Sequence, residues 1–319
     1  MSDAGNWCLI ESDPGVFTEM LQGFGVKGLQ VDELYSLEDH DTTLAKPVYG
    51  LVFLFKWLPG DEPCGVPSSN SNIFFAQQVI QNACATQAII NMLMNITDTD
   101  VELGPILKEY KEFASDFDPA TRGECLSNSD KIRTVHNSFA RPTLYELDMK
   151  GGKSEDNFHF VTYIPVGNKV YELDGLREAP IEVADIPEGT DWMDAVTPAI
   201  QTRIQKYSEG EIHFNLMAVI PNRKQKLEEM LKTVQEANVD NSMDEQIAEL
   251  QVEIANEEEK HQQYHRENAR RRHNYLPFVI ELLRVLAKEG KLIPLFDKAI
   301  NQAKERAGQK TLVDLKRKQ

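Results

Sequence analysis

The spacing of apolar residues changes at Pro221, and this change constrains the fold more than any other feature of the sequence. Before Pro221, short apolar runs such as residues 50–56 and 214–220 alternate with turn residues, which is typical of strands. After it, the chain is charged and its apolar residues recur at helical intervals. We therefore expect a mixed α/β domain over residues 1–221 and an all-helical extension over residues 222–319.

Several further elements are expected before Pro221. Apolar runs favour strands over residues 158–163 and 169–174. Helices are expected over residues 15–23, 106–113 and 129–141, and Ser129 with Asp130 is suited to cap the last of them. No internal repeat is visible in the sequence.

Composition and charge exclude several classes of protein. Of the 319 residues, 41% are hydrophobic, which supports a real core. The formal net charge of −17 argues against nucleic-acid binding and suits a partner that presents a basic segment. No apolar run is long enough to span a membrane, and residues 1–6 lack the basic start and apolar core of a secretory signal. We therefore expect a soluble intracellular protein with no membrane partner.

Cys84 is the strongest candidate for a nucleophile among Cys8, Cys64, Cys84 and Cys125, which show no zinc-site spacing. Asn82 is a good helix N-cap, and helix formers and apolar residues follow it. Cys84 then lies in the first helical turn, where free backbone N–H groups and the helix dipole favour a thiolate. A thiolate attacks carbonyl groups. The alternative interpretation is a buried structural cysteine.

His159 is the best candidate for the base that such a thiol needs. A hairpin would bring it toward Asp174 on the following strand. A loop at Val166 and Gly167 places His159 directly opposite Asp174, and a loop at Gly167 and Asn168 shifts the pair by two residues. Because side chains alternate with a period of two, both registers put His159 and Asp174 on one face. A three-residue loop would break this arrangement, and the alternative interpretation is a hairpin whose His and Asp are solvated.

A donor to the oxyanion is expected just before Cys84. A side-chain amide offers a neutral N–H group, and the backbone N–H of Cys84 offers another. Gln77 and Gln78 both fit, and their spacing does not choose between them; the alternative is an ordinary exposed glutamine. The chain order Gln, Cys, His, Asp, with the nucleophile at a helix start and the base in a hairpin, is papain-like.

The extension contains two kinds of helix. Seams of coiled-coil spacing are formed by Leu227, Leu231 and Val234, and by Met243, Ile247, Leu250 and Ile254, with a break at residues 238–242. A later helix is expected between Pro277 and Gly290. It is apolar almost all round, and Phe278 and Val285 lie off its main stripe. These apolar residues outside the main stripe favour docking of the helix to another protein. The alternative is that this helix folds back onto the first domain.

The motifs around these candidates resemble those of the ubiquitin C-terminal hydrolase family of cysteine proteases. They are Gln78-x5-Cys84 with residues 82–87, Asn157-Phe158-His159-Phe160, and Glu172-Leu173-Asp174-Gly175. The resemblance covers residues 1 to about 221, and residues 207–212 and 275–278 also resemble the long-tailed, proteasome-associated members of the family. It implies a papain-like α+β fold with a central antiparallel sheet flanked by helices.

The resemblance also implies a role for each catalytic candidate. Cys84 is the nucleophile, His159 is the general base and then the general acid, and Asp174 orients His159. Gln78 occupies the family's oxyanion position, six residues before Cys84, which selects it over Gln77. The implied reaction is hydrolysis of the bond after the C-terminal glycine of ubiquitin through a thioester, with no metal or cofactor.

Binding residues follow from the same resemblance. Leu9, Ile212 and Phe214 are candidates to contact the apolar patch of ubiquitin, although the alternative is that they belong to the core. A crossover loop over about residues 142–157 is expected to cover a narrow cleft for the ubiquitin tail.

The extension is implied to bind partners through Leu276, Pro277 and Phe278. Those partners are the ubiquitin-receptor subunit of the proteasome and, in the nucleus, a chromatin-remodelling complex, so we expect both cytoplasmic and nuclear locations. The competing hypothesis is a ubiquitin-binding scaffold with weak or no catalysis that is recruited through its tail.

Overall fold

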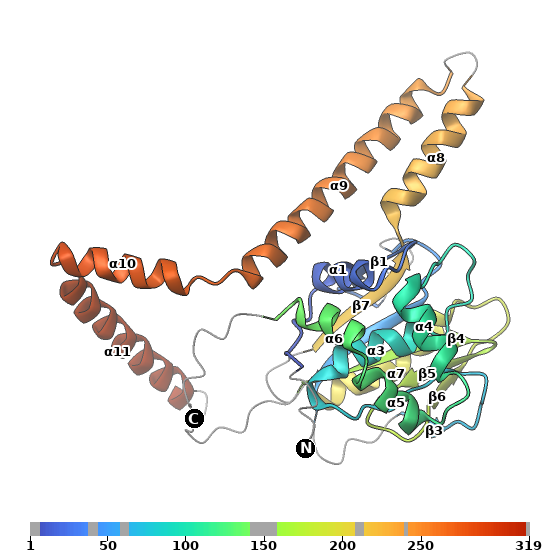
Figure 1. Cartoon of the computed structure of the whole chain (residues 1–319), viewed down its shortest axis with the longest axis horizontal. Helices are drawn as coiled ribbons and strands as arrows, with labels where there is room; N and C mark the ends of the chain where they lie inside the picture. The colour runs from blue at the N-terminus through green and yellow to red at the C-terminus, as the bar shows by residue number, and fades with distance from the viewer. Residues whose placement is uncertain are drawn as a thin grey trace. The chain divides into compact units, whose positions relative to one another are not determined.

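The computed structural model describes residues 7–37, 44–57, 64–140, 158–207, 214–238 and 242–316. The described residues divide into two compact units, the larger within residues 7–272 and the smaller over residues 273–316 (Figure 1). Among the described residues, no helix combines the length and the hydropathy that crossing a membrane requires.

A seven-stranded antiparallel sheet organises the larger unit. Its strands lie in the order β1 (Leu29–Glu33), β7 (Phe214–Pro221), β2 (Gly50–Lys56), β4 (Phe158–Val166), β5 (Lys169–Leu173), β6 (Ile181–Asp185) and β3 (Val66–Pro67). The predicted antiparallel sheet flanked by helices is therefore confirmed. The sequence analysis did not anticipate β1, β3 and β6.

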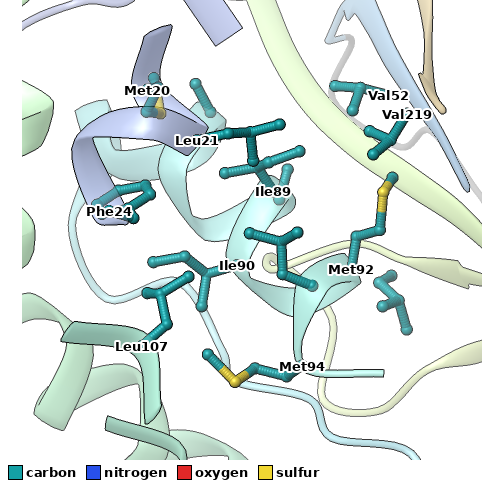
Figure 2. Packing of buried hydrophobic residues seen from close by; sticks show 14 of the residues in the cluster. Met20, Leu21, Phe24, Val52, Ile89, Ile90, Met92, Met94, Leu107 and Val219 are labelled. Carbon is teal, nitrogen blue, oxygen red and sulfur yellow. The ribbon is translucent and has the colours of Figure 1, made fainter. Parts of the chain in front are cut away.

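Alternating side chains of the sheet enter two separate cores. On one face lie α1 (Pro14–Phe24), α3 (Cys84–Leu93), α4 (Gly104–Ala114), α5 (Pro119–Ser127) and α6 (Asp130–Asn137). Figure 2 shows this core, to which α1 contributes Met20, α3 contributes Ile90, and the sheet contributes Val52 and Val219. The other face is covered by α7 (Trp192–Tyr207), whose Met193 and Ile200 join the second core.

Short-range signals set the ends of the helices. Asp13 caps α1, because its Oδ1 accepts the N–H groups of Gly15 at 2.9 Å and Val16 at 3.1 Å. The helix ends at Gly25, whose φ of 84° lies in the left-handed region that glycine tolerates. Ser129 caps α6 by accepting the Ile132 N–H at 3.4 Å, as the sequence predicted.

The first helices of the extension belong to the larger unit. α8 (Arg223–Ala237) and α9 (Asp244–Arg272) carry the two predicted seams except Met243, which directly precedes α9, and the two helices lie side by side (Figure 1). α9 also packs on α1, where a Cβ on Gly15 would lie 2.7 Å from the Tyr264 ring. Asn268 donates to the Gly15 carbonyl at 3.1 Å, and Arg271 pairs with Asp13 at 2.7 Å. The domain boundary expected at residue 221 stays a prediction.

The smaller unit contains α10 (Leu276–Lys288) and α11 (Leu292–Lys316), which contact each other. Pro277 lies in the first turn of α10, and Gly290 follows its end with a φ of 68°. Both features agree with the helix predicted between these two residues.

A buried ion pair ties α7 to the sheet beside the second core. Arg203 of α7 donates to Glu172 of β5 at 2.5 Å and to the Tyr163 hydroxyl at 3.2 Å, and all three side chains are buried. Its guanidinium also lies over the Phe55 ring, 4.1 Å from the ring centroid. Burial by itself lowers the pKa of Arg203, but the neighbouring Tyr163 and Glu172 raise it, so the guanidinium stays charged.

We predict that Arg203→Leu lowers the free energy of unfolding by about 3–5 kcal/mol, because it leaves the Glu172 carboxylate buried without its cation. Urea unfolding followed by circular dichroism measures this change. Lys131→Ala is the control, since Lys131 pairs with Glu109 on the exposed surface and should leave the midpoint nearly unchanged. Equal midpoints for wild type and Arg203→Leu would contradict the prediction.

Candidate active site

Cys84 is the first residue of α3, as the sequence predicted. The assignment of Asn82 as the N-cap was wrong. A 3₁₀ turn, Gln81–Ala83, precedes α3, the N-cap is Ala83, and no side chain caps the helix. Asn82 instead donates from Nδ2 to the Trp7 carbonyl at 3.0 Å. No side chain therefore caps the first backbone N–H groups of α3, which lie next to Cys84. Uncapped N–H groups at the start of a helix favour an anion there.

His159 and Asp174 form a buried hydrogen bond, with 2.6 Å between Nε2 and Oδ1. Val166 pairs with Lys169 and Thr162 with Leu173, so the hairpin loop is Gly167 and Asn168. This is the second of the two registers that the sequence allowed. The other neighbour that acts on the His159 ring is the Cys84 side chain, which raises the pKa of His159. Since Nε2 is occupied by Asp174, the ring nitrogen left for Cys84 is Nδ1.

The surroundings of His159 keep its ring protonated at neutral pH. Burial of the ring lowers its pKa, but hydrogen bonding and electrostatic interaction with Asp174 and Cys84 outweigh this effect and raise the pKa to about 9. An imidazolium beside a sulfur at a helix start is the setting in which a thiol acts as a nucleophile.

Arg177 and Phe55 support the His159–Asp174 pair, and the sequence analysis missed both of them. Burial raises the pKa of Asp174, and its contacts with His159, the Leu176 N–H and Arg177 bring the pKa below its usual range. Arg177 lies 3.3 Å from Asp174 Oδ2, three residues further along the chain. Phe55 is the cross-strand neighbour of His159, with ring centroids 5.9 Å apart and edge to face. The sequence offered one signal for these supporting residues, which is the arginine three positions after Asp174.

The segment before Cys84 is fixed at both of its candidate glutamines. Gln77 donates its backbone N–H to the Pro119 carbonyl at 2.8 Å and its side-chain amide to the Arg177 carbonyl at 3.1 Å. Gln78 donates its backbone N–H to the Gly175 carbonyl at 2.8 Å and its side-chain amide to the Ile80 carbonyl at 3.0 Å. Gly175 directly follows Asp174, so this segment and the Asp174 turn are held together.

His136 is buried near the same helix but has a different environment. Its Nδ1 lies 2.8 Å from Thr86 Oγ1 and its Nε2 lies 2.7 Å from the Cys8 carbonyl oxygen. Burial lowers the pKa of His136 to about 4, so its ring is neutral.

Among the described residues, no three His, Cys, Asp or Glu side chains gather as ligands for a metal ion.

The predicted binding residues fall in different places. The Leu9 side chain is 76% exposed and Phe214, at the start of β7, is 39% exposed. Ile212 and the expected crossover loop over residues 142–157 lie outside the described residues. In the smaller unit, Leu276 and Pro277 begin α10, and Phe278 is 63% exposed.

The chain is similar to known proteins over its whole length. The family model described as ubiquitin carboxyl-terminal hydrolase, family 1, matches residues 7–205, and a second model, ubiquitin carboxyl-terminal hydrolases, matches residues 247–292. The ubiquitin carboxyl-terminal hydrolase ubh-4 of Caenorhabditis elegans is 66% identical over 322 residues, which cover 100% of both chains. The ubiquitin carboxyl-terminal hydrolase isozyme L5 of Dictyostelium discoideum is 41% identical and covers 97% of this chain and 99% of its own.

A solved structure is also similar. The crystal structure of Trichinella spiralis UCH37 bound to ubiquitin vinyl methyl ester matches with a TM-score of 0.69 and 47% identity. The match covers 82% of this chain and all of that chain.

We predict that His159 titrates near pH 9 and that Asp174→Asn moves this titration to lower pH, because the negative charge that favours the imidazolium is lost. Imidazole resonances followed by NMR between pH 3 and 10 measure both values. His136 is an internal reference, since it should titrate near pH 4 in both proteins. A His159 titration that Asp174→Asn leaves in place would show that Asp174 does not hold the ring charge.

Proposed function

Since the chain belongs to ubiquitin carboxyl-terminal hydrolase family 1, whose members are cysteine-type deubiquitinases, we propose that it cleaves the bond after the C-terminal glycine of ubiquitin. The observation that carries this proposal is the buried His159, which hydrogen-bonds to Asp174 and whose pKa is raised by both Asp174 and Cys84. A scaffold without catalysis has no need to keep a buried imidazolium beside a thiol.

The first half of the reaction forms a thioester. The Cys84 thiolate attacks the glycine carbonyl carbon, a C–S bond forms, and the carbonyl electron pair moves to oxygen. The backbone N–H of Cys84 and the Gln78 side chain are the proposed donors to this oxyanion. Gln78 Nε2 donates to the Ile80 carbonyl at 3.0 Å, and a side-chain amide nitrogen carries two N–H groups, so donation to the oxyanion is compatible with this bond. Protonated His159 then gives its proton to the leaving amine as the C–N bond breaks.

The second half releases ubiquitin. Neutral His159 takes a proton from water, and the resulting hydroxide attacks the thioester carbonyl. The tetrahedral intermediate collapses, the C–S bond breaks, and ubiquitin leaves as a carboxylic acid that loses its proton to water. Cys84 and His159 return to the thiolate and imidazolium forms, and Asp174 holds the ring in place throughout.

Two features support ubiquitin as the substrate beyond family membership. Leu9 and Phe214 are exposed apolar side chains in the larger unit, and we propose that they contact the apolar patch of ubiquitin. The formal net charge of −17 favours the approach of ubiquitin's basic tail. Ile212 is proposed for the same contact on the strength of the family resemblance.

We predict that a ubiquitin probe with an electrophilic C-terminus labels the wild-type chain and leaves Cys84→Ala unlabelled, because the probe traps the nucleophile. A mass increase equal to one ubiquitin measures the labelling, and circular dichroism shows that Cys84→Ala is folded. If neither protein is labelled, the scaffold hypothesis replaces the hydrolase. If both are labelled, another cysteine is the nucleophile.

We further propose that the smaller unit docks the enzyme on the proteasome through its ubiquitin-receptor subunit. Support comes from α10 and α11, whose large apolar side chains lie exposed on the described surface. They include Phe278, Ile280, Leu282, Leu283 and Val285 of α10 and Ile293, Leu295 and Phe296 of α11. Exposed apolar helix faces of this extent favour a partner protein. A nuclear chromatin-remodelling partner, and thus both cytoplasmic and nuclear locations, follow from the resemblance and stay predictions.

We predict that Phe278→Glu abolishes co-purification of the full-length chain with proteasomes, since a charge in an apolar interface is not compensated. The matched control is Val252→Glu, which places the same charge at a 60% exposed position on α9. Immunoprecipitation followed by quantification of proteasome subunits measures the effect. Equal recovery with both variants would remove α10 from the docking surface.

A further inference from the structure

Three side-chain amides follow one another at intervals of four residues, two on the buried helix α3 and the third in the turn directly after it. They are Gln87, Asn91 and Asn95, and Asn91 is fully buried. A spacing of four places them on one side of the helix. None takes part in the reaction described above, yet a buried amide is costly unless it is hydrogen-bonded.

These amides bind the backbone of the segment that leads to the proposed oxyanion donor. Asn91 Oδ1 accepts the Ala76 N–H at 2.9 Å, and its Nδ2 donates to the Ala76 carbonyl at 3.0 Å. Asn95 makes the same pair of bonds with Phe74, both at 2.8 Å. Gln87 adds a bond to the Ala76 carbonyl at 2.6 Å. The helix side chains thus pair with alternate residues of an extended segment, as a neighbouring strand would.

The rest of the segment leaves little freedom before Gln78. The Gln77 and Gln78 N–H groups are each taken by a carbonyl at 2.8 Å, from Pro119 and Gly175. A Cβ on Gly123 would lie 2.0 Å from the Gln77 carbonyl oxygen, so α5 touches the backbone there. The segment is therefore held at Phe74, Ala76, Gln77 and Gln78, and Asn91 and Gln87 bond it to the helix that carries Cys84, with Asn91 making two of these bonds.

We propose that Asn91 is a positioning residue for catalysis, which sets the oxyanion donor Gln78 relative to Cys84. The inference rests on the proposed function, because Gln78 acts on the oxyanion only if Cys84 attacks a carbonyl. α3 carries the nucleophile at its start and Asn91 two turns later. One rigid helix thereby fixes both the attacking sulfur and the place where the negative charge develops. A misplacement of about 1 Å in such a constellation lowers rates by up to about a hundredfold.

The test compares the kcat and KM of Asn91→Leu with those of wild type, on ubiquitin carrying a fluorescent leaving group at its C-terminus. We expect kcat to fall about tenfold or more, as a displaced oxyanion donor requires, with KM changed less than twofold. In a Gln78→Ala background the same substitution should lower kcat by less than a further twofold, because the donor that Asn91 positions is already absent.

A second readout separates the oxyanion from the nucleophile. Alkylation of Cys84 by iodoacetamide forms no oxyanion, so Asn91→Leu should change its rate less than twofold. Peptide mass spectrometry resolves Cys84 from the other cysteines. Should Asn91→Leu fail to fold, Asn91→Asp keeps the shape and the acceptor for the Ala76 N–H but opposes a carboxylate to the Ala76 carbonyl, and the same loss of kcat is expected.

Asn268→Leu is the matched control, since it also removes a buried amide that bonds a carbonyl, that of Gly15, outside the segment. It should lower the melting temperature and leave kcat within twofold of wild type. Equal losses of kcat from Asn91→Leu with and without Gln78 would overturn the proposal, and so would a slowed alkylation of Cys84. Failure of the wild-type chain to turn over the substrate would instead reject the proposed function.

Discussion

The buried hydrogen bond between His159 and Asp174 is the interaction on which the active site depends. Burial alone would make His159 neutral, and only the nearby carboxylate and the Cys84 side chain reverse this tendency. The carboxylate in turn needs partners in the interior, which the Leu176 N–H and Arg177 supply. The charges of the site are thus shared over a short hairpin and the turn that follows it, and the pKa values of His159 and Asp174 are shifted by each other.

The sheet makes this arrangement rigid. His159 lies on β4 and pairs with Phe55 of β2, which lies opposite it, and the β4–β5 ladder begins three residues further along, at Thr162. The Arg203 guanidinium lies over the Phe55 ring and is held there by its hydrogen bond to the buried Glu172. A network of charge and aromatic contacts therefore continues from the second core to the edge of the imidazole ring. α3, which carries Cys84, packs in the core on the opposite face of the sheet. The active site therefore uses residues that both cores hold in place.

The sequence predicted those parts of the fold and of the site that depend on residues close together in the chain, and it missed those that depend on distant contacts. The shared face of His159 and Asp174 follows from strand periodicity in either register, so it survived an unknown loop position. β1 was missed because Gln30 and Asp32 are buried in it, where they meet the Arg223 N–H and the Lys260 side chain from far along the chain. α7 was obscured by Pro198 inside the helix. The cap at Asn82 failed because a tertiary contact with Trp7 outcompeted the local one.

The contact between α9 and α1 bears on how the enzyme behaves when it is cut. Gly15 fits against the Tyr264 ring, and Asn268 and Arg271 satisfy groups at the start of α1. A fragment that ends with β7 would keep every strand and every catalytic side chain described above. It would also uncover this part of α1 to water and leave Asp13 without its arginine, so it would be prone to self-association. A protease site after Arg272 would spare the contact, which makes that point the natural limit for a soluble catalytic fragment.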